Sequence, residues 1–474
     1  MSLGLNAQQQ LIPLNKAFNF GLNKAILNSD TLLHFGFAPF VQSRIQVENV
    51  EELVPNLKYY LDTNHTFTSR KLFHEHVTQY QNEEVQFTID PLVNFEFGRE
   101  FSDESREQQL YKNTRGFLLR LNLGSKVSVQ STFRENQVEL PSTFFKRTRF
   151  SRVAYGQGRV KKFNETGFDF AMASSNISYS PNDLLNIQVG HGKHFVGYGH
   201  RSLLLSDLAF TYPFLKINSL WFNKKLQYQN LFSSFQDLNR IQTDFEGEGL
   251  FERKQGVFHY LDYSVNSRLK IGLFEGFVTQ SLDTSGNVPV PVSYYAPVIL
   301  FNSMLHSEDS LGNSLIGLNL SLKALNNLQF YGQLAGYSLG EDFGVQLGLN
   351  YYLNFLPIKI QLEYNSSSTR IRQNQFNHYG ESLNFSYLSG TKELLSSLVF
   401  KKGRFLSQVT GSLIENNSIN SLVIDGRQSF IINPIYNLTF NLGLQYRERS
   451  SNGYSENYLY IGVSTNLQNL YFDY

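Results

Sequence analysis

The sequence predicts an all-β membrane protein: an antiparallel transmembrane β-barrel of about 18 strands with a small N-terminal helical element. Three observations predict it. The composition is poor in charge and rich in aromatic residues, no segment is apolar for long enough to cross a bilayer as a helix, and long stretches alternate between apolar and polar residues. The fold that competes with a barrel on the last point is a soluble β-sandwich.

The composition differs from that of ordinary soluble proteins. Charged residues make up 17% of the 474 residues and aromatic residues 15%, whereas about 25% of a soluble domain is charged. The chain has no uninterrupted apolar stretch of about 18 residues, the length that a membrane-spanning helix needs. A barrel explains both facts, because each strand presents a side chain to lipid only at every second residue.

Charge and cysteine content exclude several functions. The 41 basic and 40 acidic residues leave a net charge of +1, which gives no overall attraction to nucleic acid. Cysteine is absent, which excludes disulfides, cysteine-ligated zinc and thiol catalysis. We therefore expect no nucleic-acid partner, and nothing in the sequence calls for a cofactor.

Strict alternation is the strongest signal for membrane-spanning strands. Between Phe343 and Phe355 the odd positions are Phe, Val, Leu, Leu, Tyr, Leu and Phe, and the even ones are Gly, Gln, Gly, Asn, Tyr and Asn. The pattern recurs in 438–447 and 316–323. Many such runs extend over about 9 to 13 residues, which fits the length needed to cross a bilayer at a tilt and exceeds the usual strand of a sandwich.

Short turns and long loops alternate along residues 86–474, which we assign to the barrel. Residues suited to tight turns join many of the runs: Gly124-Ser125, Pro181-Asn182-Asp183, Asn266-Ser267, Asn326-Asn327, Leu356-Pro357 and Asn433-Pro434. Longer polar segments lie near 135–165, 194–213 and 280–312. Outer-membrane barrels place long loops on the outside, so we expect these three segments to face outward.

The end of the chain, Leu470 to Tyr474, is apolar at alternate positions and aromatic at the last. It resembles the C-terminal strand signature that barrel-assembly machinery recognises, with a bulge near Gln468-Asn469. We therefore expect the last strand to run to the end of the chain.

Residues 1–85 form a different segment, in which the alternation gives way to helical spacing. Apolar residues recur every four positions at Leu14, Phe18, Leu22 and Ile26, and a second helix capped by Thr68 or Ser69 would carry Leu72, Phe73, Val77 and Tyr80. We expect short amphipathic helices at the periplasmic mouth or inside the lumen. The first residues, up to Ala7, are either the remnant of a signal peptide or ordinary coil.

The stretch 190–207 is rich in glycine and histidine. It lacks the spacing and the helix of a phosphate-binding loop, which excludes nucleotide binding. His191, His194 and His200 could gather a metal ion. Because no clear carboxylate partner accompanies them, the simpler interpretation is that they bond loop backbone and hold a fold into the lumen, and we expect no metal.

Ser202, Ser206 and Asp207 lie beside these histidines and could belong to a catalytic triad. No strained nucleophile turn is visible, and proximity in sequence does not establish triad geometry, so we expect no catalytic residues and no enzyme. We regard six residues of the stretch as structural or binding residues: His191, His194, Tyr198, His200, Arg201 and Asp207.

Seven basic residues fall within one expected outer loop: Lys146, Arg147, Arg149, Arg152, Arg159, Lys161 and Lys162. No acidic residue lies between Pro141 and Asn164. Uncompensated positive charge at a membrane surface favours anionic partners, here lipopolysaccharide phosphates or an acidic surface polysaccharide. The alternative is a solvated loop that tolerates the charge.

Several segments are similar to one family of barrels. They are 187–217 with its ending Arg201 to Lys216, Phe258 to Leu261, Gly272 to Gly276, Tyr295 to Val298, Tyr331 to Leu334, Glu363 to Asn365 and Gly462 to Tyr474. Together they resemble the Wzi-like capsule-assembly barrels, especially the gliding-motility RemB-like branch. The resemblance implies a barrel of about 18 strands in the bacterial outer membrane, with N-terminal helices. It also implies a lectin-like role at the cell surface, or a surface role in gliding and type 9 secretion.

Two departures from the family pattern prevent the transfer of a ligand site. Ala296 stands where the family pattern has asparagine, and Gly336-Tyr337 stands where an acidic residue is usual. We therefore expect a non-enzymatic surface protein, surrounded by outer-membrane lipid and lipopolysaccharide, that binds surface polysaccharide or other outer-membrane proteins in a larger complex. A porin or substrate channel is the alternative function.

Overall fold

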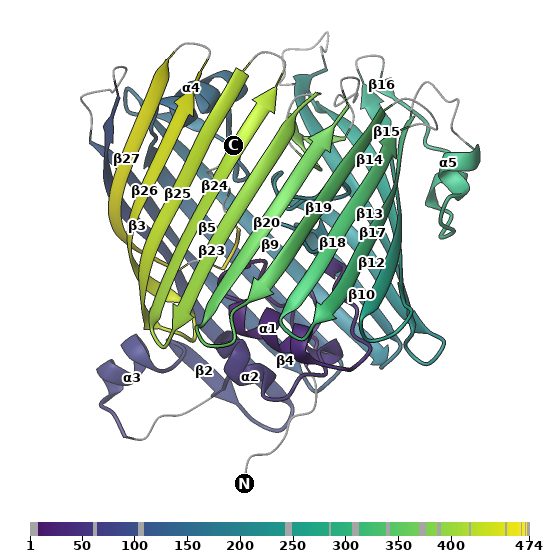
Figure 1. Cartoon of the computed structure of the whole chain (residues 1–474), viewed down its shortest axis with the longest axis horizontal. Helices are drawn as coiled ribbons and strands as arrows, with labels where there is room; N and C mark the ends of the chain where they lie inside the picture. The colour runs from purple at the N-terminus through teal and green to yellow at the C-terminus, as the bar shows by residue number, and fades with distance from the viewer. Residues whose placement is uncertain are drawn as a thin grey trace.

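Long antiparallel strands close on themselves to form one barrel (Figure 1). The computed structural model describes residues 8–59, 64–102, 109–241, 249–283, 286–305, 312–337, 342–368, 376–385, 390–416, 419–450, 453–465, 467–469 and 471. Within these residues 18 long strands pair in chain order, and β27 pairs with β3 to close the ring. The predicted fold class and strand number are confirmed.

The barrel strands are neighbours in the wall in the order in which they occur in the chain. They are β3 (Val85–Phe101), β4 (Leu110–Leu123), β5 (Val127–Glu139), β9 (Gly167–Asn182), β10 (Leu185–Gly192), β12 (Tyr212–Trp221), β13 (Leu226–Arg240), β14 (Phe251–Ser264), β15 (Leu269–Asp283), β17 (Gly312–Leu325), β18 (Leu328–Tyr337), β19 (Asp342–Tyr352), β20 (Ile358–Ser367), β23 (Lys392–Lys402), β24 (Phe405–Asn416), β25 (Ile419–Asn433), β26 (Leu438–Arg449) and β27 (Tyr454–Thr465). The short strands β2 (Thr78–Gln81), β8 (Lys161–Phe163) and β16 (Gly286–Asn287) pair antiparallel with the ends of β3, β9 and β15.

The two faces of each strand explain why the wall suits a membrane. On β26, Phe440, Leu442 and Leu444 are exposed, whereas Asn441 and Gln445 at alternate positions are buried. Because side chains alternate between the faces of a strand, the apolar row faces outward and the polar row faces the lumen. No helix in the described part of the chain is long and apolar enough to span a bilayer. We call the end with the short turns periplasmic and the other end outer, as in outer-membrane barrels.

Helices of the N-terminal segment lie at the periplasmic end (Figure 1). They are α1 (Phe20–Asn28), η1 (Gln42–Arg44), α2 (Val50–Leu53), η2 (Pro55–Leu57) and α3 (Phe67–Phe73). Leu22 of α1 packs in one cluster with Leu92 of β3 and Leu118 of β4. Phe20 and Leu27 on the same helix pack against wall residues of β19 and β23. The apolar face of α1 is therefore buried against the inner wall.

The second predicted helix is shorter than its spacing suggested. Thr68 and Ser69 lie inside α3, which ends at Phe73, and Tyr80 belongs to β2. Tyr80 is paired with Phe87 of β3. Pairing with a neighbouring strand, a long-range interaction, has overridden the local helical period there.

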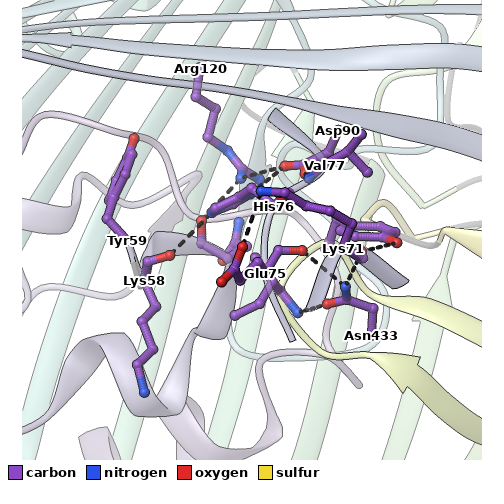
Figure 2. Close-up of polar contacts among 12 residues, drawn as sticks. Lys58, Tyr59, Lys71, Glu75, His76, Val77, Asp90, Arg120 and Asn433 are labelled. Atoms are coloured by element: carbon purple, nitrogen blue, oxygen red, sulfur yellow. Dashed lines mark hydrogen bonds and ion pairs between the residues drawn. The ribbon is translucent and has the colours of Figure 1, made fainter. Parts of the chain in front are cut away.

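Buried charges fix the end of the N-terminal segment to the barrel (Figure 2). His76 Nδ1 lies 2.6 Å from Asp90 Oδ2 on β3, and His76 Nε2 lies 3.2 Å from the carbonyl of Lys58. Arg120 on β4 donates to the carbonyl of Asn56 at 3.0 Å, and its Nη1 lies 4.0 Å from the same Asp90 oxygen. Since a buried charge without a partner is costly, this cluster favours one position of the segment.

Two segments from the outer end fold into the lumen. Residues 193–211 carry β11 (Phe195–Val196), which pairs with β1 (Phe37–Ala38) of the N-terminal segment. Residues 376–385 contain a small hairpin of β21 (Asn377–His378) and β22 (Glu381–Ser382). Side chains of both segments share one buried apolar cluster with inward-facing residues of β14, β15 and β17. These two segments therefore occupy part of the lumen and pack against its inner wall.

A glycine of the wall makes room for this filling. A Cβ atom added at Gly317 of β17 would lie 2.2 Å from Cδ2 of Leu204 in the segment 193–211. The absence of a side chain at this position lets the segment pack directly on the strand backbone.

The prediction for the end of the chain is wrong for the residues that the structure describes. The last strand ends at Thr465, and residues 467–469 and 471 are not in a strand. Asn469 donates its backbone N–H to the carbonyl of Leu14, and the Tyr471 hydroxyl donates to Asp207 at 2.6 Å. This segment therefore turns into the lumen. Leu470 and residues 472–474 lie outside the described residues.

The segment 286–305 departs from the prediction of a polar outer loop. It contains no charged residue and forms η3 (Val292–Tyr295) and α5 (Phe301–Leu305), which lies outside the barrel wall (Figure 1). Val292 is 85% exposed and Met304 79% exposed. An uncharged, apolar surface beside a lipid-facing wall is suited to contact with hydrocarbon.

A carboxylate on the outer face of the wall holds this segment. Glu275 of β15 lies on the same face of the strand as outward-facing Ile271, and yet Glu275 is buried. Its Oε1 accepts from the backbone N–H and hydroxyl of Ser303, each at 2.7 Å, and its Oε2 accepts from the N–H of Leu300 at 2.7 Å. His259 Nδ1 of β14 lies 3.1 Å from Oε2. The segment thus covers a polar cluster that would otherwise face lipid.

We expect Met304 to lie in the lipid of the membrane. The chain has no cysteine, so Met304→Cys would carry a fluorescent label at a single site. In proteoliposomes this label should be quenched by spin-labelled lipid and protected from aqueous iodide. A label on Phe150→Cys, a position 93% exposed on the outer α4, is the control and should show the reverse. Equal quenching of both labels by iodide would contradict the expected position.

Candidate functional site

An outer helix is anchored to the barrel rim by two carboxylates. α4 (Ser142–Ser151) lies between β5 and β9. The backbone N–H of Ser142 donates to Glu100 of β3 at 2.8 Å, and the N–H and hydroxyl of Thr143 donate to Glu456 of β27 at 3.1 and 2.6 Å. Both carboxylates bind the first turn, where helical N–H groups lack partners and the dipole favours negative charge. The orientation of α4 is therefore set by the closing seam of the barrel.

All seven basic residues that the sequence singled out are exposed on this loop. Lys146, Arg147 and Arg149 lie on α4, and Arg152 follows it. Arg159 lies on β7 (Gly158–Arg159), which pairs with β6 (Val153–Ala154), and Lys161 and Lys162 lie on β8. Among the described contacts, the six basic residues other than Lys146 form no ion pair with a carboxylate, and Lys146 has further contacts. We call these seven residues the basic surface.

Aromatic rings accompany the basic surface. The guanidinium carbon of Arg147 lies 3.9 Å from the ring centre of Tyr155, and that of Arg159 lies 4.5 Å from the ring centre of Phe251. Arg240, at the end of β13, lies 4.6 Å from the same Phe251 ring. Arg240 was missed by the sequence analysis because only the pairing of β13 with β14 brings it to Phe251.

The loop that carries the basic surface forms hydrogen bonds with the two segments in the lumen. Lys193 donates through Nζ to the carbonyl of Gly156 at 2.7 Å, and Glu381 accepts from the N–H of Gly156 at 2.9 Å. Burial lowers the pKa of the Lys193 ammonium and raises the pKa of the Glu381 carboxyl. The turn that carries the basic surface is therefore fixed by buried polar groups on two other segments.

The three histidines of the glycine-rich stretch 190–207 have separate surroundings and do not form one cluster. His194 is buried among the rings of Phe37, Tyr212 and Phe214, and burial lowers its pKa well below the usual value. His191 faces the carbonyl of Ala173 at 3.2 Å. The backbone N–H of His200 donates to Glu363 at 2.6 Å. No group of three or more metal-ligating side chains occurs among the residues that the structure describes.

The other residues singled out in this stretch are also held inside. Arg201 is buried and pairs with Glu393 of β23, with Nη2 2.9 Å from Oε1. Asp207 accepts from Asn469 at 2.9 Å and from Tyr471 at 2.6 Å. Tyr198 is half-buried. Arg201 therefore joins the segment 193–211 to the barrel wall, and Asp207 joins it to the segment near the end of the chain.

Ser202 and Asp207 are not joined through a histidine. The Ser202 hydroxyl donates to the carbonyl of Val196 at 2.5 Å and accepts from the backbone N–H groups of Leu204 and Leu205. This pattern stabilises a turn of the loop.

A second histidine site was not anticipated from the sequence. His378 of β21 accepts the N–H of Gln236 through Nδ1 at 3.0 Å, and its Nε2 lies 3.2 Å from the carbonyl of Thr211. The imidazole is therefore held with the proton on Nε2. Burial lowers the pKa of His378 to about 3.

We expect acid to loosen the hairpin 376–385. Above about pH 6.5 the imidazole is neutral whether it is packed or released, so its packing contributes its full stabilisation to the folded hairpin. As the pH falls from 6.5 toward 3, only the released imidazole binds a proton, and this stabilisation is lost. Hydrogen exchange in 376–385, corrected for the intrinsic pH effect, should therefore speed up between pH 7 and pH 4. The same measurement on His378→Gln should lack this step, and a step that persists in the variant would assign it to another group.

Comparison with known proteins shows the fold. No protein-family model and no curated protein sequence matches the chain. Among solved structures it is similar to Wzi of Escherichia coli, described as an outer-membrane, carbohydrate-binding β-barrel involved in group 1 capsule assembly. The TM-score is 0.59 at 12% identity, over 96% of this chain and 99% of Wzi.

Two porin-like structures match less well. The outer membrane protein opdK of Pseudomonas aeruginosa gives a TM-score of 0.46 at 11% identity, over 80% of this chain and 98% of opdK. A BenF-like porin of Pseudomonas fluorescens Pf-5 gives 0.47 at 10% identity, over 80% of this chain and 98% of the porin. At these identities the likeness to Wzi establishes one thing, that the chain has the fold of an outer-membrane β-barrel.

Proposed function

We propose that the chain is a non-enzymatic protein of the bacterial outer membrane that holds an acidic polysaccharide at the cell surface. The observation that carries the proposal is the basic surface: seven exposed cations on a loop that the barrel rim and the lumen segments hold in place. Fixed cations pair with the carboxylates of a polymer with little loss of side-chain and loop entropy.

Two further features support this proposal. Exposed Phe150 and the half-buried ring of Phe251 beside Arg159 add flat apolar area next to charge, which is the usual composition of binding surfaces for ring-shaped ligands. The fold is shared with Wzi, which is described as carbohydrate-binding. The motility role and a place in type 9 secretion rest on the RemB-like segments alone, and binding to partner proteins would use the same outer face.

Neutralising the basic surface should weaken polysaccharide binding. We expect the combined variant K146Q, R147Q, R149Q and R152Q to bind a uronate-containing polysaccharide at least about tenfold more weakly than the original protein, because several weak exposed pairs are lost together. The measurement is biolayer interferometry in detergent at low and high salt, and salt should weaken binding by the original protein more.

The matched control neutralises exposed cations at the periplasmic turns, K126Q and K225Q, and should bind as the original protein does. Unchanged binding in the α4 variant would show that the loop merely tolerates its charge. Retained affinity for lipopolysaccharide without affinity for the polysaccharide would transfer the role to lipid phosphates.

A closed lumen distinguishes this proposal from a porin. We expect the full chain to show no steady conductance in planar bilayers, because the N-terminal segment, residues 193–211 and residues 376–385 fill the lumen. Gly192 and Tyr212 are paired in register, so an Asn-Gly turn could join them in place of 193–211. That variant should conduct. Steady conductance by the original protein at neutral pH would favour the porin instead.

A further inference from the structure

A cavity of about 150 Å³ lies at the periplasmic end of the lumen. One side is made by Lys16, Asn19 and Asn23 of the N-terminal segment. The other is the inner wall, where consecutive strands place polar side chains in one band: Lys270 on β15, Ser321 and Lys323 on β17, Gln329 on β18, Asn350 on β19, and Lys359 and Gln361 on β20. The register pairs Gln329 with both Lys323 and Asn350, and Asn350 with Gln361.

The charges in this cavity are of one sign. Four lysines and Arg268 line it, and none of the described lining residues is an aspartate or glutamate. Among the described contacts, neutral groups lie beside three of the lysines, and Lys16 has further contacts. Lys16 donates to the carbonyl of His200 at 2.7 Å, Lys359 donates to Oε1 of Gln361 at 3.0 Å, and Lys270 lies 5.7 Å from the ring centre of Phe35.

Three nearby carboxylates offset part of this positive charge, but the four lysines and Arg268 outnumber them. Lys323 pairs with Asp30 at 3.2 Å, but the Asp30 side chain is 84% exposed. Asp262 and Glu363 act on the cavity lysines from behind the lining. Each is already engaged, Asp262 by His34 at 3.0 Å and Glu363 by backbone N–H groups of the loop. Cations in a partly enclosed site of this kind attract an anion strongly, because water screens them poorly.

Hydrogen-bond acceptors accompany the lysines. Asn350 is buried, and its amide nitrogen donates to Gln329 at 3.1 Å, whereas its Oδ1 has no protein partner among the described residues. Asn19 is likewise buried, with its amide nitrogen on the carbonyl of Pro13 at 2.7 Å and its Oδ1 without a protein partner in the described structure. Buried acceptors need donors, and hydroxyl groups of a ligand are suitable donors.

We propose that this cavity binds a small hydroxylated carboxylate, a sugar acid the size of one six-membered ring. The lysines pair with the carboxylate, Asn19 and Asn350 accept from hydroxyls, and the apolar lining of Ile12, Ile26 and Phe40 covers the carbon face of the ring. The volume suits one ring, since an engineered cavity of about 150 Å³ takes up benzene. The site opens at the opposite end of the barrel from the basic surface and does not depend on it.

The test is calorimetric titration of the full chain in detergent with sodium glucuronate and, separately, with glucose. Glucuronate should bind at least about tenfold more tightly than glucose, because only glucuronate has a charge for the lysines to meet. Lys359→Met should weaken glucuronate binding about tenfold. Asn350→Asp, which keeps the size of the side chain and adds a negative charge, should weaken it at least as much and leave the weak binding of glucose almost unchanged.

Two controls locate the binding. Lys402→Met removes an exposed lysine outside the cavity, and the α4 variant removes four cations of the basic surface; both should bind glucuronate as the original protein does. Heat-modified migration in gels shows which variants are folded. Equal affinity for glucose and glucuronate, or unchanged glucuronate binding in both Lys359→Met and Asn350→Asp, would overturn the proposal. Loss of binding in the α4 variant alone would assign it to the outer surface.

Discussion

Hydrocarbon contains no water that could satisfy an unpaired backbone N–H or carbonyl group, and the rest of this structure depends on that constraint. The pairing of β27 with β3 closes the wall and removes the last free edge. Closure in turn creates an inner surface of asparagine, glutamine, serine and lysine, which must either hold water or meet polar partners. In this chain much of it meets partners supplied by segments from both ends of the barrel.

Buried charges determine how these segments fit together. Arg201 reaches Glu393 on the wall, and the backbone beside it binds Glu363. Asp207 holds Tyr471 near the end of the chain, and Lys193 and Glu381 hold the turn at Gly156. Removing one partner of such a pair leaves a charge buried without compensation, which costs several kcal/mol. The pairs therefore specify one arrangement, and the outer loop with its cations is held by the same network that fills the lumen.

The membrane-spanning strands could be predicted from the sequence, because their side chains alternate between two faces with a period of two residues. The runs 316–323 and 438–447 lie within β17 and β26, and their apolar positions face outward. The alternation of apolar and polar residues is less informative at strand ends. It continues to Phe355, although β19 ends at Tyr352. The reason is that an aromatic residue in a turn at the membrane surface is as favourable as one in the strand. The error at Tyr80 has a similar origin, since helical spacing there is accidental and pairing with Phe87 determines the structure.

Features that depend on contacts between distant strands could not be predicted from local sequence patterns. The segment 286–305 did carry a signal, the absence of charge, but the carboxylate that binds it, Glu275, belongs to a strand whose outward face looks ordinary in sequence. Lys270, Lys323 and Lys359 are separated by dozens of residues, and only the strand register brings them to one cavity.

The distribution of charge along the barrel axis connects these observations. Cations outnumber the nearby carboxylates at the outer loop and at the periplasmic cavity. Between them, Glu363, Glu381, Glu393 and Asp207 are engaged by neighbouring chain segments and cannot repel or bind a passing anion without breaking the packing. A barrel that transported an anionic polymer would need cations along a continuous open path. Here the segments that bind these carboxylates lie across the lumen between the outer loop and the periplasmic cavity. This arrangement fits the proposed retention of an anionic sugar at each end better than its passage through the barrel.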